Sequence, residues 1–179
     1  MATARRLLIV WHSRTGLASQ MAGHLEGGAV STASEMGGEL IVTRRRAAEA
    51  TAEDLLSSDG YLFCAPENLA STSGEMLEFF HRTYYSAFTT DHDTGSEASV
   101  LSGRPYGVAV AAGSDGTGAA RQMARICRGW RLRPVADPLI QRNGQPQTAE
   151  AIQQPKSCPP EAALRCAELG GLVAATLLL

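Results

Sequence analysis

The sequence has no large excess of charge of either sign, because its 16 Lys and Arg residues nearly balance its 18 Asp and Glu residues. The formal net charge of −2 gives no electrostatic reason to expect nucleic acid or an anionic membrane as a partner. Long apolar runs are also missing. The C-terminal stretch 172–179 is far shorter than the roughly 18 residues that cross a bilayer, and the run Leu7–Trp11 is too short for a signal peptide. We therefore expect a cytoplasmic protein without nucleic-acid or membrane partners.

Cysteine is scarce, and the four cysteines form no Cys-x-x-Cys pair. Cys64 lies in an apolar strand and Cys127 on an apolar helical face, so both are expected to be reduced core residues of a cytosolic protein. A disulfide between Cys158 and Cys166 is the less favoured alternative. We expect no metal site.

Apolar strands and helical patterns alternate five times along the 179 residues, a length that suits one domain with a sizeable core. Continuous apolar strands joined by helices predict an α/β fold, with a parallel sheet covered on both faces, in a single domain spanning residues 1–179. Strands are expected at about 7–12, 39–44, 60–65, 106–112 and 132–140. Helices are expected at 17–35, after Thr51, after Thr72, at about 119–130 and after Pro160.

Two of these helices begin with a capping-box pattern, at Thr51–Asp54 and at Thr72–Glu75. The residues expected to face the core are Met76, Phe80 and Thr83 in the third helix and Leu169, Leu172, Val173 and Thr176 in the last. Two long loops, 89–104 and 141–157, stand out, and long loops in a compact domain are often functional or mobile. His92 in the first loop, flanked by Asp91 and Asp93, is a weak metal pattern that an exposed loop explains equally well.

The segment Leu7–Gly16 combines an apolar strand with the turn Ser13-Arg14-Thr15-Gly16, and a helical pattern follows at once. Backbone N–H groups, two hydroxyls and the positive end of the helix dipole meet at such a turn, which suits a phosphate monoester. The dinucleotide fingerprint Gly-x-Gly-x-x-Gly and the Gly-Lys-Ser/Thr of a P-loop are both absent. Because Ser-x-Thr-Gly turns also cap helices in many proteins, support must come from other loops.

Two further loops, 65–74 and 112–118, are small, polar and rich in glycine. In a doubly wound sheet, the loops after strands one, three and four converge at the C-terminal strand ends, where ligands bind. Such loops let backbone groups approach a flat heterocycle closely. The alternative is that Ser114 or Asp115 merely caps the following helix. Together the three loops favour a nucleotide ligand.

At this point the residues resemble a known family. The run from Leu8-Ile-Val-Trp-His-Ser-Arg-Thr-Gly16 to Ala29 resembles the opening of flavodoxin-like flavoproteins. Ala65-Pro66 followed by Ser73-Gly-Glu-Met-Leu-Glu-Phe-Phe-His-Arg-Thr83 is similar to their second signature, a Pro-containing FMN loop and a Gly-x-Met-x-x-Phe-x-x-Arg helix. The branch it most resembles is the NAD(P)H-dependent FMN reductases and NAD(P)H:quinone oxidoreductases. The resemblance implies a flavodoxin-like three-layer sandwich with a five-stranded parallel sheet in the order 2-1-3-4-5.

The resemblance also implies that FMN is bound without a covalent link. Its phosphate would be wrapped by Ser13, Arg14, Thr15, Gly16, Leu17 and Ala18. Its ring edge would lie against Pro66, Glu67, Asn68, Leu69 and Ala70, and its other side against Gly113, Ser114, Asp115, Gly116, Thr117 and Gly118. Ala18 departs from the family, which usually has Ser or Thr there, and the lost hydroxyl costs about 1 kcal/mol of binding. Arg14 either offsets this loss at the phosphate or points to solvent.

Near-neutral charge and loops without aromatic residues are unlike the acidic, ring-stacking one-electron flavodoxins. The sequence therefore favours a reductase that takes electrons from NAD(P)H and passes them to a quinone, a flavin or a similar acceptor. The alternatives are a one-electron carrier and a regulatory protein that binds flavin poorly. No catalytic residue is assigned. By analogy with related reductases, a homodimer or homotetramer is expected.

A few residues near these elements have two interpretations. For His12, a side chain bonded to backbone is favoured over a role at the anion, and His81 is expected to be a surface residue. The run 44–46 of three arginines is either a solvated turn or an attraction for the extra phosphate of NADPH. Tyr84 and Tyr85 either pack locally or close over the flavin of a neighbouring subunit.

Overall fold

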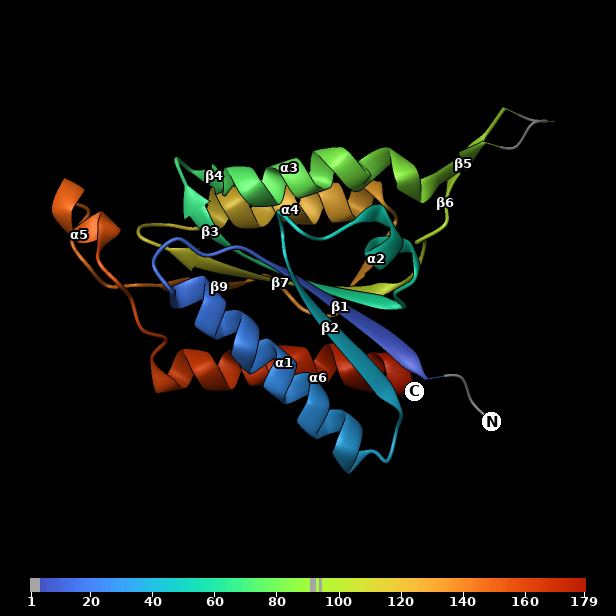
Figure 1. The fold of residues 1–179 in the computed structure, drawn as a ribbon, viewed down its shortest axis with the longest axis horizontal. Helices are drawn as coiled ribbons and strands as arrows, with labels where there is room; N and C mark the ends of the chain where they lie inside the picture. Colours follow the sequence, from blue (N-terminus) through green and yellow to red (C-terminus); the bar gives the residue numbers. More distant parts are fainter. Residues whose placement is uncertain (1–3, 91–92, 94) are drawn as a thin grey trace.

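The computed structural model describes residues 4–90, 93 and 95–179, which form a central sheet between two layers of helices (Figure 1). The parallel strands run in the order β2-β1-β3-β7-β8, with β9 also paired to β7. The predicted order 2-1-3-4-5 is therefore confirmed, with the fifth strand divided in two. These strands are β1 (Arg5–Trp11), β2 (Leu40–Arg46), β3 (Gly60–Asn68), β7 (Pro105–Ala112), β8 (Arg133–Pro134) and β9 (Leu139–Arg142).

Two prolines account for the division of the fifth strand, which was predicted as one element over 132–140. Pro134 ends β8 and Pro138 directly precedes β9, and neither can donate a backbone N–H to the sheet. β8 pairs with the start of β7 and β9 with its end, so both pieces still run parallel to it.

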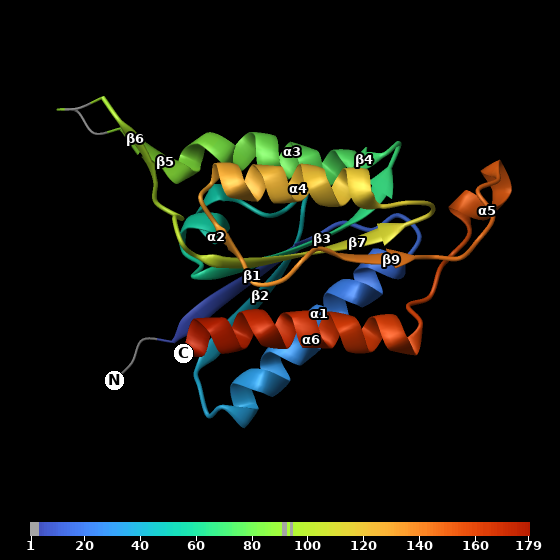
Figure 2. The ribbon, with the colours of Figure 1, turned by 180° about the vertical axis from the view of Figure 1, so that it is seen from behind.

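Helices cover both faces of the sheet (Figures 1 and 2). Successive strand residues point to opposite faces, so Leu8 and Val10 join one core while Leu7 and Ile9 join the other. This is why the strands are apolar without interruption. One face is covered by α1 (Leu17–Glu35) and α6 (Pro160–Leu178), the other by α2 (Ala52–Leu56), α3 (Gly74–Thr83) and α4 (Thr117–Gly129).

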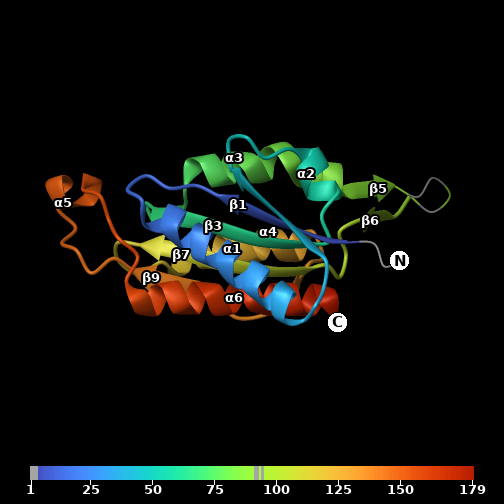
Figure 3. The same cartoon turned by 60° about the horizontal axis from the view of Figure 1, so that its bottom comes forward.

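The two ends of the sheet carry different additions (Figure 3). The short strand β4 (Ser71–Thr72) and the short helix α5 (Ala149–Gln153) lie at the end where the parallel strands terminate. At the opposite end, a 3-10 turn (Tyr84–Ala87) leads into a hairpin of β5 (Phe88–Thr90) and β6 (Glu97–Ser99). The described part of the 89–104 loop is thus remote from the C-terminal strand ends.

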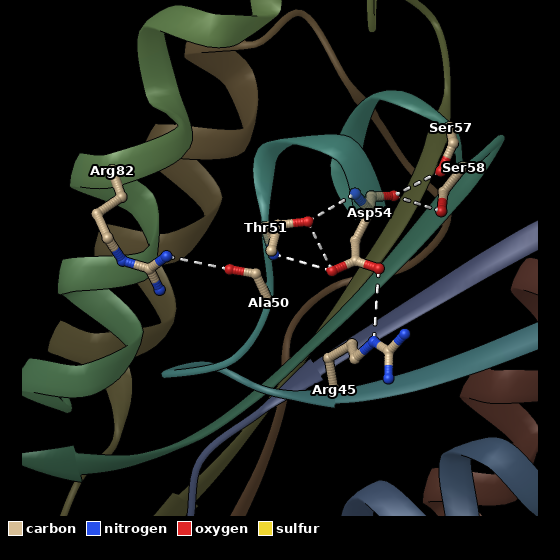
Figure 4. Close-up of polar contacts among 7 residues, drawn as sticks. All are labelled: Arg45, Ala50, Thr51, Asp54, Ser57, Ser58 and Arg82. Atoms are coloured by element: carbon tan, nitrogen blue, oxygen red, sulfur yellow. Dashed lines mark hydrogen bonds and ion pairs between the residues drawn. The ribbon is translucent and has the colours of Figure 1, made fainter.

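Several local predictions are confirmed. Helix α1 has the predicted bounds, and Met76, Phe80 and Thr83 are buried together. Thr51 and Asp54 form the predicted capping box (Figure 4): Thr51 Oγ1 accepts a hydrogen bond from the Asp54 N–H at 3.1 Å, and the Asp54 carboxylate accepts one from the Thr51 N–H at 2.9 Å.

The second capping box is wrong. Ser73, not Thr72, holds the N-cap position of α3, and its side chain makes no capping hydrogen bond. Thr72 belongs to β4 instead, since β3 continues into a hairpin that the sequence did not indicate. Glu75 is free to turn toward His12, where its carboxylate lies 3.2 Å from Nε2.

The last helix contains one error. Leu169 and Val173 are buried as predicted, whereas Leu172 is 44% exposed. Residues four apart share a helical face, while Leu172 is rotated by about 100° from Val173 and reaches the surface.

All four cysteines are free, so the disulfide alternative between Cys158 and Cys166 is wrong. Cys64 and Cys127 are buried, as predicted. Over residues 4–90, 93 and 95–179, no helix combines the length and the apolarity that crossing a bilayer requires. Asp91 and His92, part of the weak metal pattern, lie outside the described residues.

Candidate functional site

The three predicted loops meet at the C-terminal ends of β1, β3 and β7. The second and third are joined by a hydrogen bond from the Gly116 N–H to the Glu67 carboxylate, at 2.9 Å. They also touch where Gly118 packs so closely against the Ala70 carbonyl that a Cβ would overlap it. The first loop follows β1, which pairs directly with β3 in the sheet. The tertiary structure therefore brings the predicted site residues to one edge of the sheet.

The first loop has the form of an anion cradle. Gly16 is the N-cap residue of α1 and has φ +101°, a left-handed conformation that only glycine adopts without strain. No side chain in the described part of the chain caps this helix, and no acidic residue stands in its first turn. Ser13 Oγ accepts a hydrogen bond from the Gly16 N–H at 3.1 Å, which shapes the turn. The positive end of the α1 dipole is thus available to a negative ligand.

The remaining residues of this loop divide by exposure. The Leu17 and Ala18 side chains are buried, so these residues can offer a ligand only their backbone N–H groups. Arg14 is exposed, and its charge contributes to lowering the pKa of His12. The Arg14 guanidinium therefore lies close enough to influence charged groups at this loop.

The second loop is a strained hairpin. Strand β3 continues to Asn68, turns at Leu69 and Ala70, and returns as β4. Both turn residues have positive φ, +52° and +61°, in a two-residue turn that normally selects Asn or Gly. The Leu69 side chain is fully exposed at the tip. Such conformations cost about 1–3 kcal/mol per residue and concentrate at functional sites.

Helix α4 holds this hairpin and supplies the third loop. Gln122 accepts a hydrogen bond from the Thr72 N–H at 2.8 Å. Gly116, with φ +77°, is the N-cap residue of α4, so neither Ser114 nor Asp115 occupies that position. The Asp115 carboxylate instead bonds Thr117, and this bond lowers the pKa of Asp115. Because the Gly116 N–H donates to the Glu67 carboxylate, this carboxylate lies at the start of α4, where the helix dipole favours a negative charge.

A fourth segment, predicted as the long loop 141–157, also reaches the site. The Asn143 N–H donates to the Ala112 carbonyl at 2.8 Å, and the Lys156 N–H donates to the Thr15 carbonyl at 2.8 Å. Gln20 of α1 clamps the second contact, because its amide bonds both the Lys156 carbonyl and the Cys158 N–H. The polar composition and length of 141–157 were the available signal for a functional segment.

His12, at the end of β1, makes contacts that the sequence did not predict. Its Nε2 lies 3.2 Å from Glu75 Oε1, whereas its Nδ1 has no hydrogen-bond partner among the described residues. The interpretation of a side chain bonded to backbone was therefore wrong. The side chain is buried, and burial is the main cause that lowers its pKa, against the opposing charge of Glu75.

Two more buried hydroxyls near this edge lack partners within the described residues: Thr72 Oγ1 and Ser73 Oγ. Thr72 is 2% exposed and Ser73 is fully buried. Buried polar atoms are nearly always hydrogen-bonded, so unpaired atoms at one edge point to a missing polar partner.

Two of the three predicted arginines are paired away from the loops: Arg45 with Asp54 beside α2, and Arg44 with Glu26. Arg46 lies over the Trp11 ring, 5.5 Å from its centroid, and its charge acts on His12. Tyr84 stacks on the Trp130 ring with centroids 5.8 Å apart, so its role in this chain is packing.

Two residues at the far end of α3 lie at the surface. Tyr85 is 82% exposed, at the end of α3 that is remote from the loops. His81 is exposed in the last turn of α3, as predicted.

Neither a protein-family model nor a curated protein sequence matches the chain. Solved structures do match over nearly its whole length. An oxidoreductase from Corynebacterium diphtheriae has a TM-score of 0.70 at 18% identity and covers 98% of both chains. An archaeal flavodoxin has a TM-score of 0.68 at 14% identity, covering 96% of this chain and 98% of its own.

A flavodoxin, described as WrbA-like, from Agrobacterium tumefaciens has a TM-score of 0.61 at 13% identity, covering 97% of this chain and 99% of its own. These likenesses show that the chain has the flavodoxin-like fold, as the sequence resemblance implied.

Proposed function

We propose that the chain binds FMN without a covalent link at the C-terminal edge of its sheet and acts as an oxidoreductase. Electrons would come from NAD(P)H and pass to a quinone, a flavin or a similar small acceptor. The observation that carries this proposal is the uncapped start of α1 at Gly16, placed at the same edge as the two Gly-rich loops. The names of the fold neighbours, flavodoxins and an oxidoreductase, support a redox role.

The residues present suit the parts of FMN. Backbone N–H groups of 14–18 and the hydroxyls of Ser13 and Thr15 would hold the phosphate. The hairpin 66–70 and the loop 113–118 would hold the ring, with backbone groups that glycine leaves accessible. When bound, the flavin supplies the hydride and electron chemistry.

The chain itself orients the flavin and controls access to it. Neither loop contains an aromatic side chain to cover the ring, which leaves a face for a nicotinamide and then for an acceptor. The Glu67 bond to Gly116 would fix the spacing of the two loops. These contacts set position and access, which is where protein groups contribute to hydride transfer.

The test is a visible spectrum of the purified protein with added FMN, followed by NAD(P)H without oxygen. The proposal expects a shifted flavin spectrum that bleaches rapidly, with two electrons per flavin. Bound flavin that NAD(P)H leaves oxidised would favour the one-electron carrier. Absence of flavin binding would favour the regulatory alternative and refute the cofactor assignment.

A matched pair of glycine variants locates the site. Gly16→Ala forces an L residue into a left-handed turn beside the Lys156 carbonyl, and we expect FMN affinity to fall about tenfold or more. Gly37→Ala imposes the same kind of strain at the other end of α1, where the space is open, and should leave affinity unchanged. Equal effects of the two variants on the dissociation constant would contradict the placement of the phosphate.

We further propose a cytoplasmic homodimer or homotetramer. The four free cysteines suit a reducing compartment. The exposed Tyr85 and the projecting β5–β6 hairpin are surfaces that a second copy would cover. Light scattering on a sizing column measures the mass, and a monomer at micromolar concentration would refute the assembly.

A further inference from the structure

His12 is the residue immediately before the phosphate turn, and it is absent from the predicted set of flavin contacts. It is 7% exposed, and its backbone N–H is bonded to the Cys64 carbonyl at 3.0 Å, which fixes its place at the end of β1. His12 directly precedes the turn, and the charge of Arg14 in that turn acts on its imidazole. The residue therefore adjoins the proposed phosphate site.

The two ring nitrogens of His12 are in unequal positions. Nε2 lies 3.2 Å from the Glu75 carboxylate, so Nε2 is the ring nitrogen placed to carry a proton. Nδ1 is then a bare acceptor, buried and without a partner in the described part of the chain. Glu75 is half exposed and belongs to the first turn of α3, so the histidine lies between a solvated carboxylate and the phosphate turn.

The charges that act on His12 come from three elements. Glu75 on α3 favours the imidazolium, whereas Arg14 on the turn and Arg46 on β2 oppose it. Burial is the largest influence and also opposes it, so the pKa of His12 is lowered from its ordinary value. These influences together favour the neutral imidazole in the free protein.

A bound phosphate dianion reverses this balance. It adds two negative charges beside the ring, and it supplies the acceptor that a protonated Nδ1 requires. We propose that His12 belongs to the phosphate site and takes up a proton from solvent as a phosphate monoester binds, so that Nδ1–H donates to the ligand while Nε2–H remains on Glu75. This inference rests on the proposed function, with FMN as the source of the phosphate.

The sign of the pH dependence follows. Proton uptake on binding means that affinity for FMN rises as pH falls from 8 to 6.5, by up to about tenfold per pH unit for one linked proton. Below about pH 6 the phosphate itself begins to bind its second proton, which weakens binding again. A site without a titrating partner shows only the second effect.

Three variants separate these contributions. His12→Gln keeps a hydrogen-bonding side chain that cannot titrate, so the rise in affinity between pH 8 and 6.5 should disappear. Glu75→Gln removes the carboxylate that favours the imidazolium, so the rise should move to lower pH, and this exposed change does not threaten folding. His24→Gln, exposed on α1, is the control and should match the wild type.

The measurement is calorimetric titration with FMN at pH 7 in two buffers of different ionisation enthalpy, which gives the protons taken up per flavin bound. We expect uptake by the wild type and by His24→Gln, less by Glu75→Gln, and none by His12→Gln. Riboflavin, which lacks the phosphate, should bind without uptake. Uptake that persists in His12→Gln, or that riboflavin reproduces, would overturn the proposal.

Inorganic phosphate distinguishes failure of this proposal from failure of flavin binding. Proton NMR follows the imidazole resonances through a pH titration, and the His12→Gln spectrum assigns the His12 signal. Phosphate should raise the pKa of His12 and leave the His24 signal unaffected. If FMN does not bind but phosphate has this effect, only the flavin assignment fails; if phosphate leaves the pKa of His12 unchanged, the inference is refuted.

Discussion

Polar groups beside α2 and polar groups at the C-terminal edge of the sheet are arranged in opposite ways. Beside α2, the Asp54 carboxylate accepts hydrogen bonds from Thr51 and Arg45, and the Ser58 hydroxyl donates to the Asp54 carbonyl at 2.8 Å (Figure 4). At the sheet edge, His12 Nδ1 and Ser73 Oγ are buried with no partner in the described residues.

This difference distinguishes groups that stabilise the fold from groups that are available to a ligand. Groups that satisfy one another stabilise the folded chain and leave little for a ligand to add. Groups that are buried and unpaired carry an unfavourable free energy until a polar partner arrives. The α2 region should therefore respond to mutation through stability, and the sheet edge through ligand binding.

The largest stability effect is expected from Arg82→Ala. Its guanidinium donates to the Ala47 carbonyl at 2.8 Å and to the Ala50 carbonyl at 3.1 Å, joining α3 to the chain before α2. Losing these charge-assisted bonds should lower the free energy of unfolding by about 2 kcal/mol, measured by urea denaturation. Arg125→Ala, an exposed arginine on α4, is the control. FMN affinity should be unchanged in both variants.

Acid should act on the α2 region in a predictable direction. Burial opposes ionisation of Asp54, but its bonds to Thr51 and the charge of Arg45 outweigh this and lower the pKa below its ordinary value of 3.8. The stabilisation is therefore present above about pH 4 and is lost as pH falls through the folded-state pKa. Asp54→Asn should cost about 1 kcal/mol at pH 7 and flatten the stability curve between pH 5 and 2. If the stability of this variant fell between pH 5 and 2 as steeply as that of the wild type, the role assigned to Asp54 would be contradicted.

Replacing two buried serines by alanine should change stability in opposite directions in the two regions. Ser58→Ala removes a satisfied hydroxyl and should destabilise the protein by about 1 kcal/mol. Ser73→Ala removes an unpaired one, so the free protein should gain up to about 1 kcal/mol while its affinity for FMN falls. Thermal unfolding without ligand measures the change in stability, and titration with FMN measures the change in affinity. Equal losses of stability would break the distinction between the regions.

The smallest effect is expected at the hairpin tip. Leu69 is fully exposed with φ +52°, so Leu69→Gly relieves backbone strain and should raise stability by about 0.5 kcal/mol. Leu164→Gly, an exposed position within α6, should instead lower stability by about 1 kcal/mol. Chemical denaturation compares the two, and a destabilised Leu69→Gly protein would show that the leucine side chain itself is required.

Local patterns were sufficient for much of the architecture. The apolar runs, the 17–35 helix and the Thr51–Asp54 cap were readable because each depends on neighbours in sequence. The hairpin at Leu69–Ala70 was not, since its left-handed turn has no Asn or Gly and is held by Gln122 and Gly118 from α4. Contacts between distant segments overrode local preference there.

The sequence alone determined the class of the protein: alternating strands and helices, a Ser-x-Thr-Gly16 turn, and loops that permit a nucleotide. Only the tertiary structure decided which polar groups find partners. Glu75 was expected to cap its own helix, yet it meets His12 at the end of β1, and Lys156 meets Thr15 from a distant part of the chain. Hydrogen-bond satisfaction depends on contacts that span the fold, and among the described residues these contacts leave the buried atoms His12 Nδ1 and Ser73 Oγ without a partner.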